Sequence, residues 1–237
     1  MANPYDELRK AREMLSHELY SDAIFLARKA HEEISKTDDF SEEKLAQGLI
    51  YEIQGKALLI EKEYSRASSY LGQSLLIYSR LSKMKYANDV AQSQVNALWE
   101  LSRQKVRQGQ HEKGAYFLNQ ASMSLSQAGL ELFSAELKAC AFAVRAEGTN
   151  LEGEKKQFYQ RAIQSLQNLS RVEPVIHGHF NYFNALLLKL TNTESALNFA
   201  IEAHNHYKLT ERKDWIERAF HLINEITTEL DITFDTP

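Results

Sequence analysis

The sequence predicts an all-α protein, an α-solenoid in which antiparallel helix pairs stack one after another, and three observations lead to this prediction. A short residue pattern recurs along the chain, and a self-similar period of this kind is typical of stacked-helix arrays. Its small residues, Ala23, Ala67, Gly114 and Ala196, are separated by 44, 47 and 82 positions, and the last gap fits two repeats of about 41. With only 9 Gly and 3 Pro in 237 residues, the composition favours long helices with short turns.

The recurring pattern indicates close contact between the two helices of a pair. An aromatic or His residue is followed at the third position by a small residue, and apolar or small residues come four and seven positions later. Small residues let two helices approach, and the aromatic residue is expected to fill the elbow between them. The copies are Tyr20/Ala23/Ala27/Ala30, Tyr64/Ala67/Leu71/Ser74, His111/Gly114/Leu118/Ala121 and a weaker Thr193/Ala196/Ala200/Ala203.

Capping residues and breakers place the individual helices. Asn3 and Pro4 form an N-cap followed by a proline in the first turn, Ser41 is the expected N-cap of the third helix, and Gly129 is an expected C-cap. Pro174 is expected to break the chain, so that the ninth helix begins near Gly178. The expected helices cover about 4–18, 21–36, 41–62, 65–82, 87–107, 110–127, 131–147, 154–169, 178–190, 194–207 and 213–230.

These segments make about five helix pairs and one additional C-terminal helix. The last helix carries an apolar stripe that includes Trp215, Leu222 and Ile226. Because an open-ended array needs its final apolar face covered, this helix is predicted to be a cap. The sequence therefore predicts a single repeat domain over residues 1–230 and a flexible tail over residues 231–237.

Composition narrows the classes of partner. The formal net charge of −4 gives no global attraction to nucleic acid or to an anionic membrane, so neither is expected as a partner. No stretch has the apolar length of a membrane span, and the N-terminus lacks an apolar signal core. The single Cys140, in an apolar helical stretch, is expected to be a small buried residue and suits a reducing compartment. A cytoplasmic protein is predicted.

At these residues the chain resembles the tetratricopeptide-repeat (TPR) proteins. The segment GKALLIEKEYSRASSYLGQSL resembles the repeat best, with Gly55 at a small first-helix position, Tyr64 at the elbow and Ala67 at the small position of the second helix. The period here exceeds that of the family, about 34 residues, by about two helical turns, so longer helices are expected. The resemblance implies a superhelix that binds partners along the face lined by its first helices.

That resemblance directs attention to basic residues on the first helices. When the repeats are aligned on Ala11, Gly55 and Ser102, a cation follows each of the three small residues. A column of cations beside an aromatic side chain would suit an acidic peptide segment or a terminal carboxylate. The predicted partner-binding residues are Arg12, Lys56, Asn96, Trp99, Arg103 and Arg107. Filling of exposed helix positions by Lys and Arg is the simpler explanation of the same pattern.

No catalytic, cofactor or metal site is predicted. Phosphate loops, dinucleotide fingerprints, nucleophile elbows and the HExxH motif are absent from the sequence. Two short motifs, His177-x-His179 and His204-x-His206, look like metal ligands, but helical residues two positions apart point to different faces. His177 and His179 are expected in a turn after Pro174, where their geometry would be less constrained.

The function that the sequence favours is a non-enzymatic scaffold or adaptor that binds a protein or peptide with an acidic segment. One alternative is a regulatory protein of the helical-repeat type that senses a short signalling peptide. A third is an α-helical enzyme, for which the spacing from Arg171 to His177, found in some helical ribonucleases, would be the only pointer. The partner, its pathway and the oligomeric state do not follow from the sequence.

Overall fold

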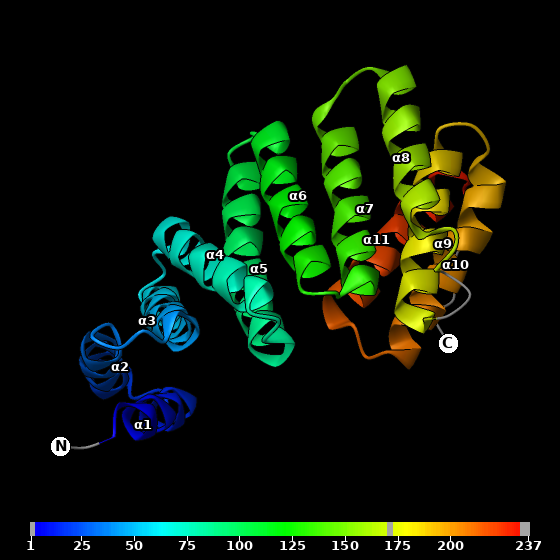
Figure 1. Ribbon diagram of the computed structural model, residues 1–237. Helices are drawn as coiled ribbons and strands as arrows, with labels where there is room; N and C mark the ends of the chain where they lie inside the picture. The colour runs from blue at the N-terminus through cyan, green and yellow to red at the C-terminus, as the bar shows by residue number, and fades with distance from the viewer. Residues whose placement is uncertain (1–2, 170–172, 233–237) are drawn as a thin grey trace. The chain divides into compact units, whose positions relative to one another are not determined.

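Helices form all the regular secondary structure in the part of the chain that the structure describes. The computed structural model describes residues 3–169 and 173–232 and has no strand among them. Five helix pairs and a final helix follow one another there, as predicted (Figure 1). The helices are α1 (Pro4–Ser16), α2 (Tyr20–Ile34), α3 (Phe40–Ile60), α4 (Tyr64–Arg80), α5 (Met84–Arg107), α6 (His111–Gln127), α7 (Glu131–Gly148), α8 (Glu152–Leu166), α9 (Pro174–Lys189), α10 (Thr193–Leu209) and α11 (Lys213–Glu229).

One turn geometry ends many of these helices. A single residue adopts positive φ after the helix, and the amide that follows it donates to the carbonyl five positions earlier. In the α3–α4 turn, for example, the Glu63 amide lies 2.9 Å from the Leu58 carbonyl oxygen. This is the Schellman arrangement, which satisfies the last helical carbonyls and reverses the chain within three residues. The positive-φ residues between helices are Glu18, Lys62, Ser82, Gly109, Gly129 and Glu211.

The recurring sequence pattern marks the starts of second helices. Its first residue is also the first residue of α2, α4, α6 and α10. Its small residue is buried in every copy, and Ala23, Ala67 and Ala196 have no exposed surface. Gly55 of α3 confirms the close approach: a Cβ added there would lie 2.5 Å from Leu71 Cγ of α4. The predicted helix register is therefore confirmed.

Two of the residues expected to start or break helices have other roles. The N-cap of α3 is Asp39 and not Ser41, because the Asp39 carboxylate accepts from the Glu42 amide at 3.2 Å. Glu173 before Pro174 is extended, but α9 begins at Pro174 itself and not near Gly178. Proline fits there because the first-turn amides have no helical acceptor and its φ is already helical. His177 and His179 consequently lie on a helix and not in a turn.

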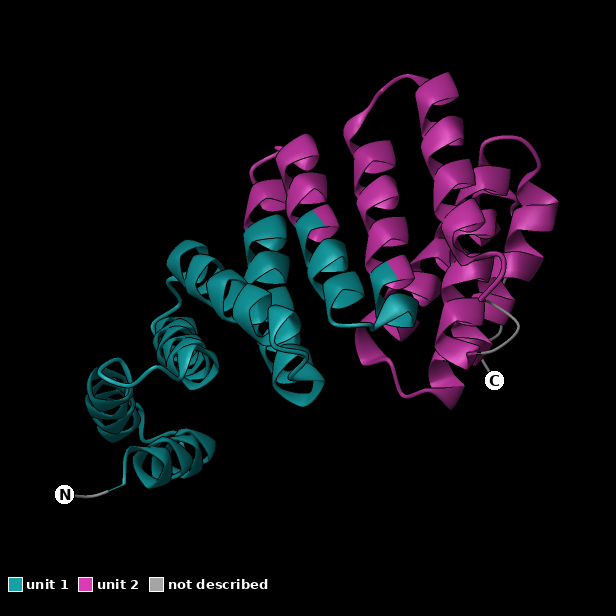
Figure 2. Ribbon diagram, in the orientation of Figure 1, with its two compact units in different colours: residues 1–103, 120–134 teal, residues 104–119, 135–237 magenta. Residues whose placement is uncertain are grey.

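Two compact units divide the chain (Figure 2). Unit 1 comprises residues 1–103 and 120–134, and unit 2 comprises residues 104–119 and 135–237. In unit 1, a buried cluster from α1, α2 and α3 includes Leu8, Ile34, Leu49 and Ile53. In unit 2, α11 places Leu222, Ile223 and Ile226 against the alanines of α9 and α10. The predicted covering role of the last helix agrees with this packing.

Other expectations have mixed outcomes. Cys140 is buried, as predicted, and burial raises the pKa of its thiol well above the ordinary value. No helix in the described ranges is both long and apolar enough to cross a membrane. The single domain over residues 1–230 stays a prediction. Most of the predicted flexible tail, residues 233–237, lies outside the described residues.

Candidate partner-binding site

A buried carboxylate gathers two of the predicted site residues in unit 1. The side chain of Glu52, on α3, is 5% exposed. Lys56, one turn further along α3, places Nζ 2.7 Å from Glu52 Oε1, and Arg12 of α1 places Nη1 3.6 Å from Oε2. Two cations therefore share one carboxylate. Because Arg12 and Lys56 remain 22% and 25% exposed, this group presents a surplus positive charge at the surface.

The Arg12 guanidinium is held in place by two tyrosines as well. Its Nη2 donates to Tyr78 Oη at 2.9 Å, and Tyr78 Oη donates to Glu52 Oε2 at 2.9 Å. The guanidinium carbon lies 3.5 Å from the ring centroid of Tyr86 on α5, a distance that suits a cation–π contact. Burial, with the nearby Glu52 charge, raises the pKa of Tyr78, so its hydroxyl keeps its proton and remains a donor.

A glycine makes room for the buried tyrosine of this group. A Cβ added to Gly48 of α3 would lie 2.8 Å from Tyr78 Cε1, so a side chain there would collide with the ring. The Gly48 carbonyl also accepts from Ser74 Oγ of α4 at 2.8 Å. The polar group is thus built into the contact between α3 and α4. We call Arg12, Glu52, Lys56, Tyr78 and Tyr86 the Glu52 cluster.

Unit 2 contains a related polar group around Glu136 of α7. His179 of α9 lies between two partners: its Nε2 is 2.9 Å from Glu136 Oε1, and its Nδ1 is 2.8 Å from Tyr207 Oη of α10. Arg212, at the start of α11, donates from Nη2 to Glu136 Oε1 at 3.0 Å. As in unit 1, a glycine makes room for the tyrosine, because a Cβ on Gly178 would lie 2.7 Å from Tyr207 Cε1.

The charges of this second group keep Glu136 ionised. Burial alone would raise the pKa of Glu136, but the hydrogen bond and charge of His179 and the charge of Arg212 outweigh it and lower the pKa. The two ring nitrogens of His179 thus lie against the ionised carboxylate and the Tyr207 hydroxyl. His179 and Tyr207 have no exposed surface, whereas the Arg212 side chain is 40% exposed.

The remaining predicted residues all lie on α5. Asn96, Arg103 and Arg107 are exposed on α5, and Trp99 is half-buried there. Arg103 pairs with Glu100 of the same helix at 3.1 Å. Of the expected column of cations, Arg12 and Lys56 are brought together, because both contact Glu52. Arg171, whose spacing from His177 suggested an enzyme as the third alternative, lies outside the described residues.

Sequence reasoning missed the acceptor that organises the site. Glu52 lies four residues before Lys56, a spacing that places both side chains on one helix face and could have indicated a pair. Its contacts with Arg12 and Tyr78 join residues 40 and 26 positions away in the sequence, and no local pattern predicts them.

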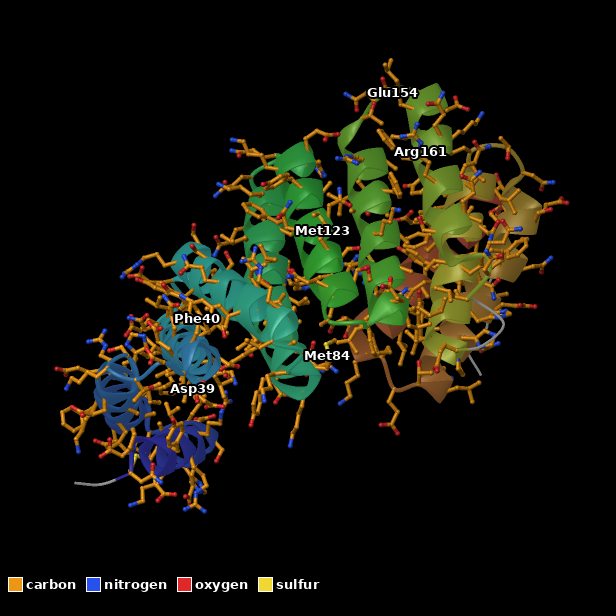
Figure 3. All side chains as sticks on the ribbon, viewed as in Figure 1. Asp39, Phe40, Met84, Met123, Glu154 and Arg161 are labelled. Carbon is orange, nitrogen blue, oxygen red and sulfur yellow. The ribbon has the colours of Figure 1, made fainter. Side chains whose placement is uncertain are left out.

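A cavity of about 800 Å³ lies within unit 2, between the start of α6, the end of α7 and α8. Lys113, Arg145 and Arg161 line it together with Glu112 and Glu154. Arg145 pairs with Glu112 at 3.1 Å, and Glu154 accepts from Thr149 Oγ1 at 2.6 Å. Glu154 and Arg161, both labelled in Figure 3, lie on α8. The cavity offers mixed charges with a basic excess.

Comparisons with known proteins do not place the chain in a family. No protein-family model and no curated protein matches the chain. Among solved structures, the chain is similar to a Podosopora anserina protein with nearly identical TPR-like repeats, assigned as a kinesin light chain, at 15% identity and a TM-score of 0.35. The likeness covers 98% of this chain and 99% of that one. At this TM-score it carries no information about what the present chain binds.

Proposed function

We propose that this chain is a TPR-like helical-repeat scaffold that binds an acidic segment of a protein or peptide at the Glu52 cluster. The observation that carries the proposal is the convergence of Arg12 and Lys56 on one buried carboxylate, which leaves one positive charge uncompensated at the surface. An incoming carboxylate would complete the charge balance. The scaffold is proposed to act without catalysis, and its cytoplasmic location stays a prediction.

Preorganisation supports this assignment over a general attraction by exposed cations. Arg12 is already fixed by Tyr78, Tyr86 and Glu52, so a partner would not have to order a flexible side chain. Charge-assisted hydrogen bonds from a fixed guanidinium are among the stronger polar contacts, and their fork geometry suits a carboxylate. Exposed pairs such as Arg103–Glu100 lack this support and contribute little.

Peptide binding to defined variants tests the proposal. The probe is a fluorescently labelled peptide rich in Glu and Ser, and its neutral counterpart carries Gln in place of Glu. Fluorescence anisotropy should show that Arg12→Gln with Lys56→Gln weakens binding of the acidic peptide at least about tenfold, because close charge pairs across an interface contribute strongly. Wild-type binding should weaken as salt rises.

Two further variants make the result specific. Arg9→Gln with Lys36→Gln removes the same charges from exposed pairs of unit 1 and should leave binding within about twofold. Arg12→Gln/Glu52→Gln/Lys56→Gln removes all three charges together, which avoids a buried unpaired carboxylate, and should also lose binding. Equal weakening by the control pair, or equal binding of the neutral peptide, would contradict the proposed site.

The cavity of unit 2 favours a peptide-sensing regulator as the second candidate. Its volume of about 800 Å³ lies within the range of small-ligand sites. Hydrogen exchange with the acidic peptide bound separates the two candidates. Protection confined to residues near Arg12 and Lys56 supports the scaffold, whereas protection around Arg145 and Arg161 supports the regulator.

A further inference from the structure

Three metal-ligating side chains meet on neighbouring helices of unit 2. Glu202 and His206 lie one turn apart on α10, and His177 lies on the adjacent α9. Each offers one ligand atom, and these atoms all lie within 4.8 Å of one another. The two imidazole rings are 4.3 Å apart between centroids. The spacing of Glu202 and His206 directs both side chains to one helix face.

The surroundings of these side chains suit metal ligands. His206 Nδ1 is buried and has no hydrogen-bond partner among the described residues, so no protein donor occupies its lone pair. Asn181 Nδ2 lies 3.3 Å from Glu202 Oε2, a contact that can orient the carboxylate as outer-shell groups do in metal sites. Glu202 is exposed and both histidines are half-buried, which leaves a path for an ion to enter.

The ligand set decides which ions fit. Two imidazoles and one carboxylate suit Zn²⁺ and related divalent transition metals, whereas Mg²⁺ and Ca²⁺ prefer oxygen ligands. Ligand atoms of a tetrahedral zinc site are about 3.3 Å apart, since each bond is about 2.0 Å long. Binding would therefore draw the three ligand atoms closer than their present separations of up to 4.8 Å. Three protein ligands would leave the fourth position to water or to another molecule.

We propose that His177, Glu202 and His206 form a binding site for a single Zn²⁺ ion that joins α9 to α10. The ion would connect two helices whose contact also carries Tyr207 and Gly178, and so it would stabilise this pair directly.

Metal titration of the full chain tests this site. Calorimetry should show one Zn²⁺ bound per chain, Co²⁺ should give the visible absorption of a tetrahedral complex, and Zn²⁺ should raise Tm because it binds only the folded state. Mg²⁺ and Ca²⁺ at the same concentration should neither bind at one equivalent nor raise Tm. Absence of saturable binding at one equivalent would overturn the proposal.

Matched variants locate the ion. Glu202→Gln, which keeps the shape of an exposed side chain, and His206→Ala should each raise the Kd at least about tenfold, since loss of outer-shell partners alone costs that much. The control is His204→Ala, two positions away on α10, whose ring lies 6.3 Å from that of Phe220 between centroids. Its Kd should equal that of the wild type. If His204→Ala weakens binding as much as Glu202→Gln does, binding is scattered over the histidines and the proposed site is wrong.

Discussion

At the scale of single residues, the same solution to a packing problem occurs in both units. Tyr78 and Tyr207 each lie 14 positions after the first residue of their helix, and each lies against a glycine of the preceding helix. Their hydroxyl groups reach a buried glutamate, directly in unit 1 and through His179 in unit 2. The large ring fills the helix contact, and the polar groups satisfy its hydroxyl, as burial of tyrosine requires.

The two glycines should therefore tolerate no side chain. Gly48→Ala and Gly178→Ala each push a Cβ to within 3 Å of a fully buried tyrosine ring, and overpacking of this kind costs about 1–3 kcal/mol. Thermal or urea unfolding measures the loss. The control is Gly153→Ala in the first turn of α8, where an added Cβ meets no atom within 4 Å. That change should be neutral or stabilising by up to about 1 kcal/mol, because alanine favours a helix over glycine. Equal stability of all three variants would contradict the close approach.

Glu136 should make the stability of unit 2 sensitive to acid. Its pKa in the folded chain is lowered below the ordinary value of 4.5, so the folded state favours the ionised form more than the unfolded state does. The resulting stabilisation is complete above that ordinary value and is lost as pH falls through the lowered pKa. Glu136→Gln should therefore unfold more easily at pH 7 but should lose less stability than the wild type on acidification below about pH 4.5.

A control carboxylate separates this effect from the general response of the protein to acid. Glu131, also on α7, is exposed, and Glu131→Gln should keep the acid dependence of the wild type. Urea unfolding at a series of pH values provides the comparison. Parallel acid profiles for Glu136→Gln and the wild type would show that Glu136 does not account for the dependence.

At the scale of helices, capping residues in the sequence predicted several of the helix ends, because the hydrogen bonds that determine these ends are local. Asn3 accepts from the Tyr5 amide at 3.1 Å, as its capping position predicted, and Gly129 adopts φ 76° at the end of α6. Ser41 and Asp39 are both favourable caps two positions apart. The structure uses Asp39, which leaves Glu42 at the third helical position. Pro174 carries the same ambiguity, because proline both ends helices and begins them.

The site was predicted only in part, because its contacts join distant segments. The repeat register placed Arg12 and Lys56 at equivalent positions, and the structure brings them to one carboxylate. The register could not reveal that Lys56 pairs with a buried Glu52. The grouping of His177 with Glu202 and His206 was missed because comparison within each short motif could not combine residues from two helices.

At the scale of the whole molecule, contacts are dominated by neighbours in the sequence. Within unit 1, α2 contacts α1 and α3; within unit 2, α10 contacts α9 and α11. In such arrays each repeat depends mainly on its immediate neighbours, so stability is a sum of local contributions and unfolding can begin in one part. The two compact units provide a natural division for such behaviour.

Equivalent substitutions in the two units should therefore have separate effects. Ala67 and Ala196 hold the same position of the recurring pattern, and neither has exposed surface. Leucine at either position should overpack a helix crossing and cost about 1–3 kcal/mol. Hydrogen exchange followed by mass spectrometry should show faster exchange in α3 and α4 for Ala67→Leu, and in α9 and α10 for Ala196→Leu. Each variant serves as the control for the other. If both variants accelerate exchange evenly along the whole chain, the units unfold as one cooperative body, and the local description of stability is wrong.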